Sequence, residues 1–208
     1  MDHDQRMTAA LQADTALAAT IVKAIPELER DFRLAEGALS ERFMLEVKAS
    51  MRKAAPEPWE VGDTNYSVFL RSPQWKPTKG LGHGDAWLEI TEISADDLNR
   101  TWIGVAVGTS QLGLELVWRA GLAGAAALVL INKPHADALA KIGFNKNQDA
   151  TRLFIPITID RMRLSKGYSE NDLTEALGPV RKAVEAVVAA KTEIDAVIEA
   201  ARAKAKAK

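Results

Sequence analysis

Carboxylates able to hold a metal ion gather in one short acidic stretch. Asp85 and Glu89 alternate with Trp87 and Thr91, which places all four side chains on one face of a predicted strand. Convergent carboxylates are the ligands that Mg²⁺ prefers in proteins. The same alternation is typical of the wetter face of an antiparallel strand, and we prefer this second interpretation.

A Glu-x-Lys pattern occurs at Glu46-Val47-Lys48. Restriction-type nucleases use such a pair, together with an earlier acid, to bind Mg²⁺ and to orient a water molecule. Their pair lies on a strand, whereas Phe43, Val47 and Met51 recur here at helical spacing. Residues two apart on a helix point away from each other, so solvated helix charges are the favoured interpretation.

The two patterns combine into one enzyme hypothesis. It is a divergent magnesium-dependent nuclease that uses Asp85 and Glu89 with Glu46 or Lys48. We keep this hypothesis, with Mg²⁺ as its cofactor, as the alternative to a chain without catalytic activity.

Other metal and nucleophile chemistries find less support in the residues present. The chain has no cysteine, which excludes thiol nucleophiles and thiolate metal sites. His83 and Asp85 with His135 have the composition of a non-haem iron site. That chemistry belongs to barrels with many strands, whereas nearly half of this chain is expected to be helical. We therefore predict no metal centre and no cofactor.

A basic loop with an aromatic residue is the best candidate for a contact surface. It contains Arg71, Lys76 and Lys79 without an acid, and its Trp75 is expected to be exposed. Trp87, on the neighbouring strand, is a further aromatic side chain that is expected to face outward. Polar loops of this type also need such residues simply to turn.

The last nine residues are rich in bases. Arg202, Lys204, Lys206 and Lys208 alternate with alanine, and this suits the negative end of a helix dipole. A protein that binds nucleic acid through this tail without cutting it is a further alternative. The whole chain has 27 basic and 28 acidic side chains, so its net charge gives no field that would attract nucleic acid.

Two helices are expected before residue 56. Apolar residues recur at helical spacing between Thr8 and Ile25, and Pro26 is expected to end that helix and to open the next. A second helical pattern runs from Glu27 to Lys53. Its apolar face consists of Leu28, Phe32, Ala35, Leu39, Phe43, Val47 and Met51.

The middle of the chain changes to short runs rich in aromatic and β-branched residues, which predicts a sheet. Strands are expected at 66–71, 85–93, 101–108 and 112–119, the last two joined by a short turn. Such connections favour antiparallel neighbours. Residues 120–131 are interpreted as a buried strand, although their alanines also suit a helix.

A helix is expected at 134–143, followed by a strand at 152–159 that Pro156 marks as an edge strand. Ser169 is in position to cap a last helix, whose apolar stripe extends almost to the end of the chain. A single helix of that length would measure about 50 Å, more than the width of such a domain. We expect part of it to project or to meet a second copy.

These elements predict an α+β fold, with a mainly antiparallel sheet flanked by N-terminal helices and a long C-terminal helix. One compact domain would contain a helical segment at 1–55, a sheet core at 56–168 and the long helix with its basic tail at 169–208. The start of the chain is polar, and its most apolar run of 12 residues is too short to span a bilayer. A cytoplasmic protein without membrane contact is expected.

The favoured functional hypothesis is a non-catalytic binding or regulatory protein that acts through its sheet loops and terminal helices. The clustered tryptophans, the basic loop and the long amphipathic helices motivate it. Its ligand is unknown, and its partner is expected to be another protein or a second copy of the chain.

Overall fold

The computed structural model describes residues 15–64, 67–76, 84–93, 101–108, 110–130, 133–146 and 152–207. Its centre is a six-stranded sheet in the order β1-β2-β3-β4-β6-β5, in which all neighbouring strands are antiparallel. The strands are β1 (Glu60–Asp63), β2 (Val68–Arg71), β3 (Ala86–Glu92), β4 (Leu112–Trp118), β5 (Asn145–Lys146) and β6 (Leu153–Ile157). The predicted α+β class with a mainly antiparallel sheet is confirmed.

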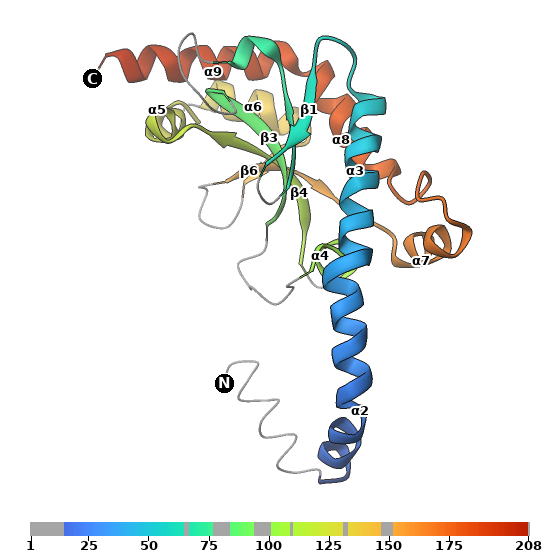
Figure 1. Ribbon diagram of the computed structural model, residues 1–208. Helices are drawn as coiled ribbons and strands as arrows, with labels where there is room; N and C mark the ends of the chain where they lie inside the picture. Colours follow the sequence, from blue (N-terminus) through green and yellow to red (C-terminus); the bar gives the residue numbers. More distant parts are fainter. Residues whose placement is uncertain are drawn as a thin grey trace.

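Helices precede, interrupt and follow the sheet (Figure 1). They are α2 (Thr15–Leu34), the π-helix η1 (Ala35–Leu39), α3 (Ser40–Ala54), the 3₁₀ turn η2 (Pro73–Trp75), α4 (Trp102–Val107), α5 (Ala120–Leu130), α6 (Lys133–Lys141), α7 (Arg161–Glu170), α8 (Gly178–Ala189) and α9 (Lys191–Lys206). Helix α3 packs against α8, β1 and β2, whereas α9 packs against α5 and α6.

Alternation of side chains along β3 determines which face of the sheet meets the helices. Ala86, Leu88 and Ile90 are fully buried, whereas Trp87 and Glu89 between them are half-buried on the second face. The predicted strands at 66–71, 85–93 and 112–119 correspond to β2, β3 and β4. β1 was not predicted.

The predicted strand at 101–108 is wrong, because these residues form helix α4. The side chain of Thr101 caps it by accepting a hydrogen bond from the Gly104 N–H at 2.9 Å. The helix also buries Val105 and Ala106. Capping and core packing therefore override the strand propensity of this short run. The hairpin expected between 101–108 and 112–119 does not form, and β4 pairs with β3 instead.

The predicted strand at 120–131 is also wrong, because Ala120–Leu130 is helix α5. Its buried residues are Leu122, Ala125, Ala126 and Val129, which form one helical face. This face lies against α9. The alanines, which are the best helix formers, were the correct indication.

The break predicted at Pro26 does not occur, since α2 continues through it. A proline inside a helix leaves one carbonyl without its N–H donor and bends the axis. Both effects are tolerated here because Val22, Ile25 and Pro26 are exposed to water. Figure 1 shows α2 bending in its N-terminal part.

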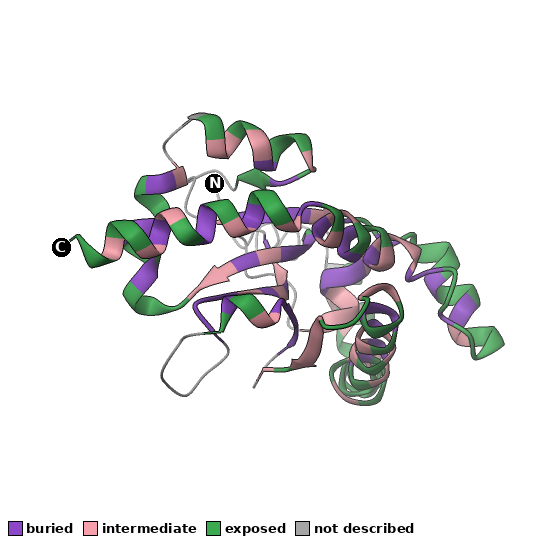
Figure 2. Cartoon of the chain, turned by 90° about the horizontal axis from the view of Figure 1, so that it is seen from above, coloured by how far each residue is buried: buried purple, intermediate pink, exposed green. Residues whose placement is uncertain are grey.

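The single C-terminal helix of about 50 Å is wrong as well. Ser169 lies in the last turn of α7, which ends at Asn171 with a left-handed φ of 58°. The chain then turns, and Ala190 separates α8 from α9. The predicted apolar stripe is nevertheless buried throughout, and Figure 2 shows buried and exposed residues alternating along α9. The break at Ala190 allows both helices to keep this stripe on the core.

Strand β6 is not a free edge along its whole length. β5 pairs with Leu153 and Phe154 on its outer side. Pro156, which has no N–H to donate, lies beyond this pairing and faces only Gly113 of β4. The helix predicted at 134–143 is observed as α6, and Gly143 follows it with a positive φ of 101°.

Gly113 is expected to be essential for the packing of the second sheet face. A Cβ at this position would lie 2.7 Å from Ile93 Cγ1 and 3.1 Å from Phe154. We expect Gly113→Ala to lower the free energy of unfolding by about 1–3 kcal/mol in urea titrations. The control Gly124→Ala, exposed on α5 with open space around it, is expected to raise that free energy by up to about 1 kcal/mol. Equal effects of the two substitutions would contradict this account.

Candidate protein-binding surface

The apolar stripe shared by α2 and α3 is covered along only one of these helices. On α3, the side chains of Phe43, Val47 and Met51 are fully buried. On α2, Leu28 is 54% exposed and Phe32 is 46% exposed. The predicted amphipathic face is therefore real, but its N-terminal half extends beyond the sheet (Figure 1).

Large exposed apolar side chains are concentrated on this extension. Among the described residues, seven of the ten large hydrophobic side chains that are exposed lie between residues 15 and 39. They are Leu17, Val22, Ile25, Leu28, Phe32, Leu34 and Leu39. Apolar side chains scattered singly over a surface are ordinary, but a contiguous group marks an interaction site.

The point where α2 leaves the body is anchored on two sides. The hydroxyl of Ser40 donates to the Ala35 carbonyl at 2.6 Å and accepts from the Ile103 N–H of α4 at 3.3 Å. From α7, the Tyr168 hydroxyl donates to the Leu39 carbonyl at 2.8 Å. These bonds occupy carbonyls of the π-helical turn η1. The direction of α2 is therefore determined by the folded body.

Tyr168 is well suited to this anchoring role. Burial raises the pKa of its hydroxyl to about 12, with a smaller contribution from Glu46 that opposes the nearby Arg42 guanidinium. That guanidinium lies 5.1 Å above the centre of the tyrosine ring. The hydroxyl therefore stays protonated, and able to donate, throughout the physiological pH range.

Two adjoining hollows run along this helix. The first is lined by Leu28, Glu29, Phe32, Arg33 and Glu36. The second has a volume of about 460 Å³, shares Glu36 with the first, and continues along α3 to the β1–β2 turn and α4. Its apolar lining includes Met44, Leu45, Val68 and Trp102. Because Glu36 lines both hollows, we refer to the two together as the α2–α3 groove.

The predicted Glu-x-Lys pair lies on α3, as its helical spacing indicated. Lys48 lines the α2–α3 groove and forms an ion pair with Asp63 of β1. Glu46 is near Tyr168, on a different side of the helix. The two side chains therefore do not form the strand-borne pair of a restriction-type nuclease.

The acids of the predicted strand are separated along it. Asp85 precedes β3 and is buried between Arg119 and Arg202, whose Nε atoms each lie 2.9 Å from one of its oxygens. Glu89 accepts hydrogen bonds from Thr64 at 2.9 Å and Trp87 at 3.0 Å. Four residues of extended chain span about 13 Å. Within the described residues, no three acidic or histidine side chains form a group able to hold a metal ion.

Two histidines belonged to the weaker iron-site idea. His83 lies outside the described residues, and His135 is half-buried near the start of α6.

The expected exposure of Trp75 is wrong, since this side chain is only 1% exposed. The centroid of its ring lies 5.3 Å from that of the Trp59 ring in an edge-to-face arrangement. Its indole N–H donates to Asp195 of α9 at 2.6 Å. Arg71 is buried as well, beside Glu60. The loop folds against the body because its aromatic ring contributes more as core than as surface.

The remaining candidates of the basic loop are distributed differently. Lys76 is exposed and forms an ion pair with Glu60. Trp87 lies half-buried on the second sheet face, where it donates to Glu89. Lys79 lies outside the described residues. Arg71, Trp75 and Lys76 are thus brought to one end of the sheet, and Trp87 lies on the strand beside it.

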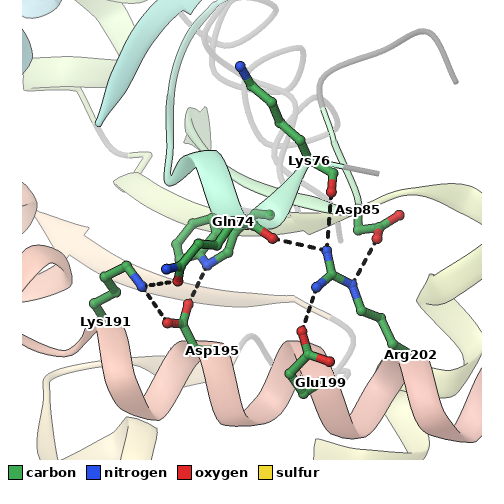
Figure 3. A network of polar contacts seen from close by, with 8 residues as sticks. Gln74, Lys76, Asp85, Lys191, Asp195, Glu199 and Arg202 are labelled. Carbon is green, nitrogen blue, oxygen red and sulfur yellow. Dashed lines mark hydrogen bonds and ion pairs between the residues drawn. The ribbon is translucent and has the colours of Figure 1, made fainter. Parts of the chain in front are cut away.

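The first base of the tail is part of a structural network (Figure 3). Arg202 donates to Asp85, to Glu199 and to the backbone carbonyls of Gln74 and Lys76, the last two at 3.2 and 3.4 Å. Earlier on the same helix, Lys191 and Asp195 hold the side chains of Gln74 and Trp75. This network joins α9 to the turn at η2, while Lys204 and Lys206 are exposed.

The α2–α3 groove was missed at the sequence level, although a signal for it exists. Val22, Leu34 and Leu45 lie off the apolar stripe that packs the core. A helix with more apolar positions than one face requires is expected to contact something on a second side. These extra positions, and not the charged motifs, indicated the surface.

Comparisons of the chain with protein-family models, with curated proteins and with solved structures found no match. Among the described residues, no helix has both the length and the apolar character needed to cross a membrane.

Arg202 is expected to stabilise the fold. Arg202→Ala leaves the buried Asp85 with Arg119 as its remaining cation and frees two backbone carbonyls. We expect a loss of about 2 kcal/mol in the free energy of unfolding. Lys206→Ala, on the same helix and exposed, is expected to change it by less than about 0.5 kcal/mol. Equal urea midpoints for the two variants would contradict a structural role for Arg202.

Glu60 is expected to contribute to acid sensitivity. Hydrogen bonds from Arg71, and then from Lys76, lower the pKa of this carboxyl below its ordinary value of 4.5. A carboxylate with a lowered pKa stabilises the fold above its ordinary pKa, and the contribution is lost as the pH falls through its folded-state pKa. Glu60→Gln is therefore expected to be less stable than wild type at neutral pH, with the difference shrinking at acid pH. Thermal unfolding from about pH 7 to about pH 3 measures this, and a constant difference would contradict it.

Proposed function

We propose that this chain is a non-catalytic binding or regulatory protein that docks a helical protein partner along α2 and the α2–α3 groove. The observation that carries the proposal is the exposed apolar stripe on α2, anchored in a fixed direction by Ser40 and Tyr168.

The energetics of an isolated helix support a docked partner. Helices in proteins owe most of their stability to packing of an amphipathic face, and α2 has its apolar side in water. Complete burial of a Leu or Phe side chain contributes roughly 1.5–3 kcal/mol. Leu28 and Phe32 are about half exposed, so a partner that covers them would stabilise the complex by a substantial part of that amount.

The shape of the groove supports a helical partner. The helix residues that line its two hollows run from Leu28 to Lys48, which is about 20 residues or about 30 Å of helix. An elongated apolar groove with charged edges is the surface that amphipathic helices use, through anchors three or four residues apart. Glu29, Arg33 and Glu36 supply both signs of charge along it.

The charged candidates are engaged within the chain, which favours binding over catalysis as the proposal. Asp85 pairs with two arginines, Lys48 pairs with Asp63, and Glu89 accepts two hydrogen bonds from neutral groups. The magnesium-dependent nuclease and the nucleic-acid-binding protein stay predictions, to be checked with plasmid DNA, divalent cations and a salt titration. A cytoplasmic location is likewise part of the proposal.

Site-specific photocrosslinking in the native host tests the docking surface. The full chain carries photoreactive benzoylphenylalanine either in place of Phe32 or in place of Met162, which is 71% exposed on α7. We expect one discrete crosslinked product from position 32 that is absent from position 162. Leu28→Asp, introduced beside the photoreactive group, is expected to reduce that product at least about tenfold, because a charge would enter the apolar contact.

The control position separates docking from general exposure. No product from position 32, or the same product from both positions, would overturn the proposed function. The mass of the product reports whether the partner is this chain or another protein.

A further inference from the structure

We propose that the partner of the α2–α3 groove is a basic amphipathic helix, whose apolar face enters the groove and whose lysine or arginine side chains lie beside that face. This inference rests on the proposed function and names the chemistry of its partner. The apolar lining of the two hollows, and the charges left unpaired along them, support it.

Two unpaired carboxylates lie where the two hollows join. Glu36 lines both hollows, and Glu41 lines the deeper one. Both residues are exposed, and neither forms an ion pair with another of the described residues. A carboxylate without a cation of its own chain beside it is available to a cation of a partner.

The other charges that line the groove are matched within the chain. Lys48 pairs with Asp63 of β1 at one end of the deeper hollow. In the first hollow, Arg33 lies 4.0 Å from a carboxylate oxygen of Glu29. Each base of the described lining thus has an acid beside it, and the charge that remains is negative. An anionic partner such as nucleic acid would be repelled from this groove.

This negative charge belongs to one side of the helices and not to the helices as a whole. From residue 15 to residue 54 the chain has seven bases and six acids. Arg42 lies over the ring of Tyr168 from α7, and Arg30 pairs with its neighbour Asp31. Neither arginine lines the groove. The sides of the helices therefore differ in charge, and the side that forms the groove selects for a basic partner.

The deeper hollow offers an apolar contact to an anchor side chain. The hydroxyls of Ser40 and Ser67, which line it, already donate to backbone carbonyls of the chain. Leu45 is 68% exposed and Trp102 is half-buried, so an apolar side chain placed there would remove both from water. The partner is therefore expected to insert a large apolar residue between its basic ones.

The spacing of the two carboxylates fits one turn of a partner helix. Glu36 and Glu41 are five residues apart in the sequence, which is about 7.5 Å along a helix. Bases four residues apart on a partner helix are separated by about 6 Å along its axis. Their long flexible side chains cover the difference, so one base can reach each carboxylate.

Two matched synthetic peptides test the chemistry of the partner with the full chain. Each is an amphipathic helix of about 20 residues, with leucine at three- and four-residue spacing. One peptide has lysine and the other has glutamate at the positions beside the leucines. Fluorescence anisotropy of the labelled peptide measures each dissociation constant. We expect the lysine peptide to bind in the micromolar range, and at least about tenfold more tightly than the glutamate peptide, because attraction at two contacts replaces repulsion.

Charge reversal on the chain supplies the matched variants. The double variant Glu36→Lys with Glu41→Lys is expected to prefer the glutamate peptide, and this new preference also requires the variant to be folded. The control Glu185→Lys with Glu193→Lys, at exposed positions on α8 and α9, changes the net charge by the same amount. It is expected to keep both wild-type affinities within about twofold, because exposed charges are screened beyond about 8 Å at physiological ionic strength.

Equal binding of the two peptides, or no binding of either below about 100 µM, would overturn the basic partner. A double variant that keeps the wild-type preference, or a control that loses it, would overturn the partner as well. Photocrosslinking from position 32 separates this outcome from failure of the docking function. A product that is lost with Leu28→Asp but unchanged by the Glu36→Lys and Glu41→Lys pair would leave docking intact and remove only the basic partner.

Discussion

The sheet and α8 cover the apolar face of α3 and no more of the long N-terminal helix, and the arrangement of the rest of the chain follows from this limit. Burial of Phe43, Val47 and Met51 attaches α3 to the core. Once a helix is nucleated, each further residue adds a hydrogen bond that offsets the entropy lost in fixing it, so the helix continues beyond the body as α2. The part that continues carries the same kind of side chains but finds no surface of its own chain, among the residues that the structure describes, to cover them.

The anchoring of η1 converts this extension into a presented surface. Hydrogen bonds through Ser40 and Tyr168 hold the turn against α4 and α7. A helix held in one direction loses less conformational freedom on binding than a mobile segment, so more of its contact energy remains for affinity. The π-helical turn therefore belongs to the functional argument as well as to the fold.

At the opposite end of the molecule, polar residues that suggested a binding site are used for construction. Arg202 and Asp195 of α9 hold the turn at η2 and the start of β3 through Asp85 and Trp75 (Figure 3). When a buried carboxylate is held by two arginines, removal of one arginine strongly destabilises the fold. Such a network is therefore a structural element. The basic tail and the aromatic loop, expected as separate contact surfaces, meet each other there.

The sequence predicted elements well where a long pattern had only one interpretation. Strict alternation over 85–93 was enough to place β3 and its two faces. The short apolar runs at 101–108 and 120–131 fit both a strand and a helix, and their caps and packing partners decided for the helix. The predictions at Pro26 and at Ala190 were wrong in opposite senses. A solvent-exposed proline did not break the predicted helix pattern, whereas the chain breaks between two helices at a buried alanine. The surroundings that decide such cases come from distant parts of the chain.

For the candidate surface the division is equally clear. The order of residues alone determined that one apolar stripe runs through residues 28–51. Only the tertiary structure decided that Phe43, Val47 and Met51 are covered while Leu28 and Phe32 face water. Burial is a property of what lies opposite a side chain, and the strands and helices opposite this stripe are encoded elsewhere in the chain.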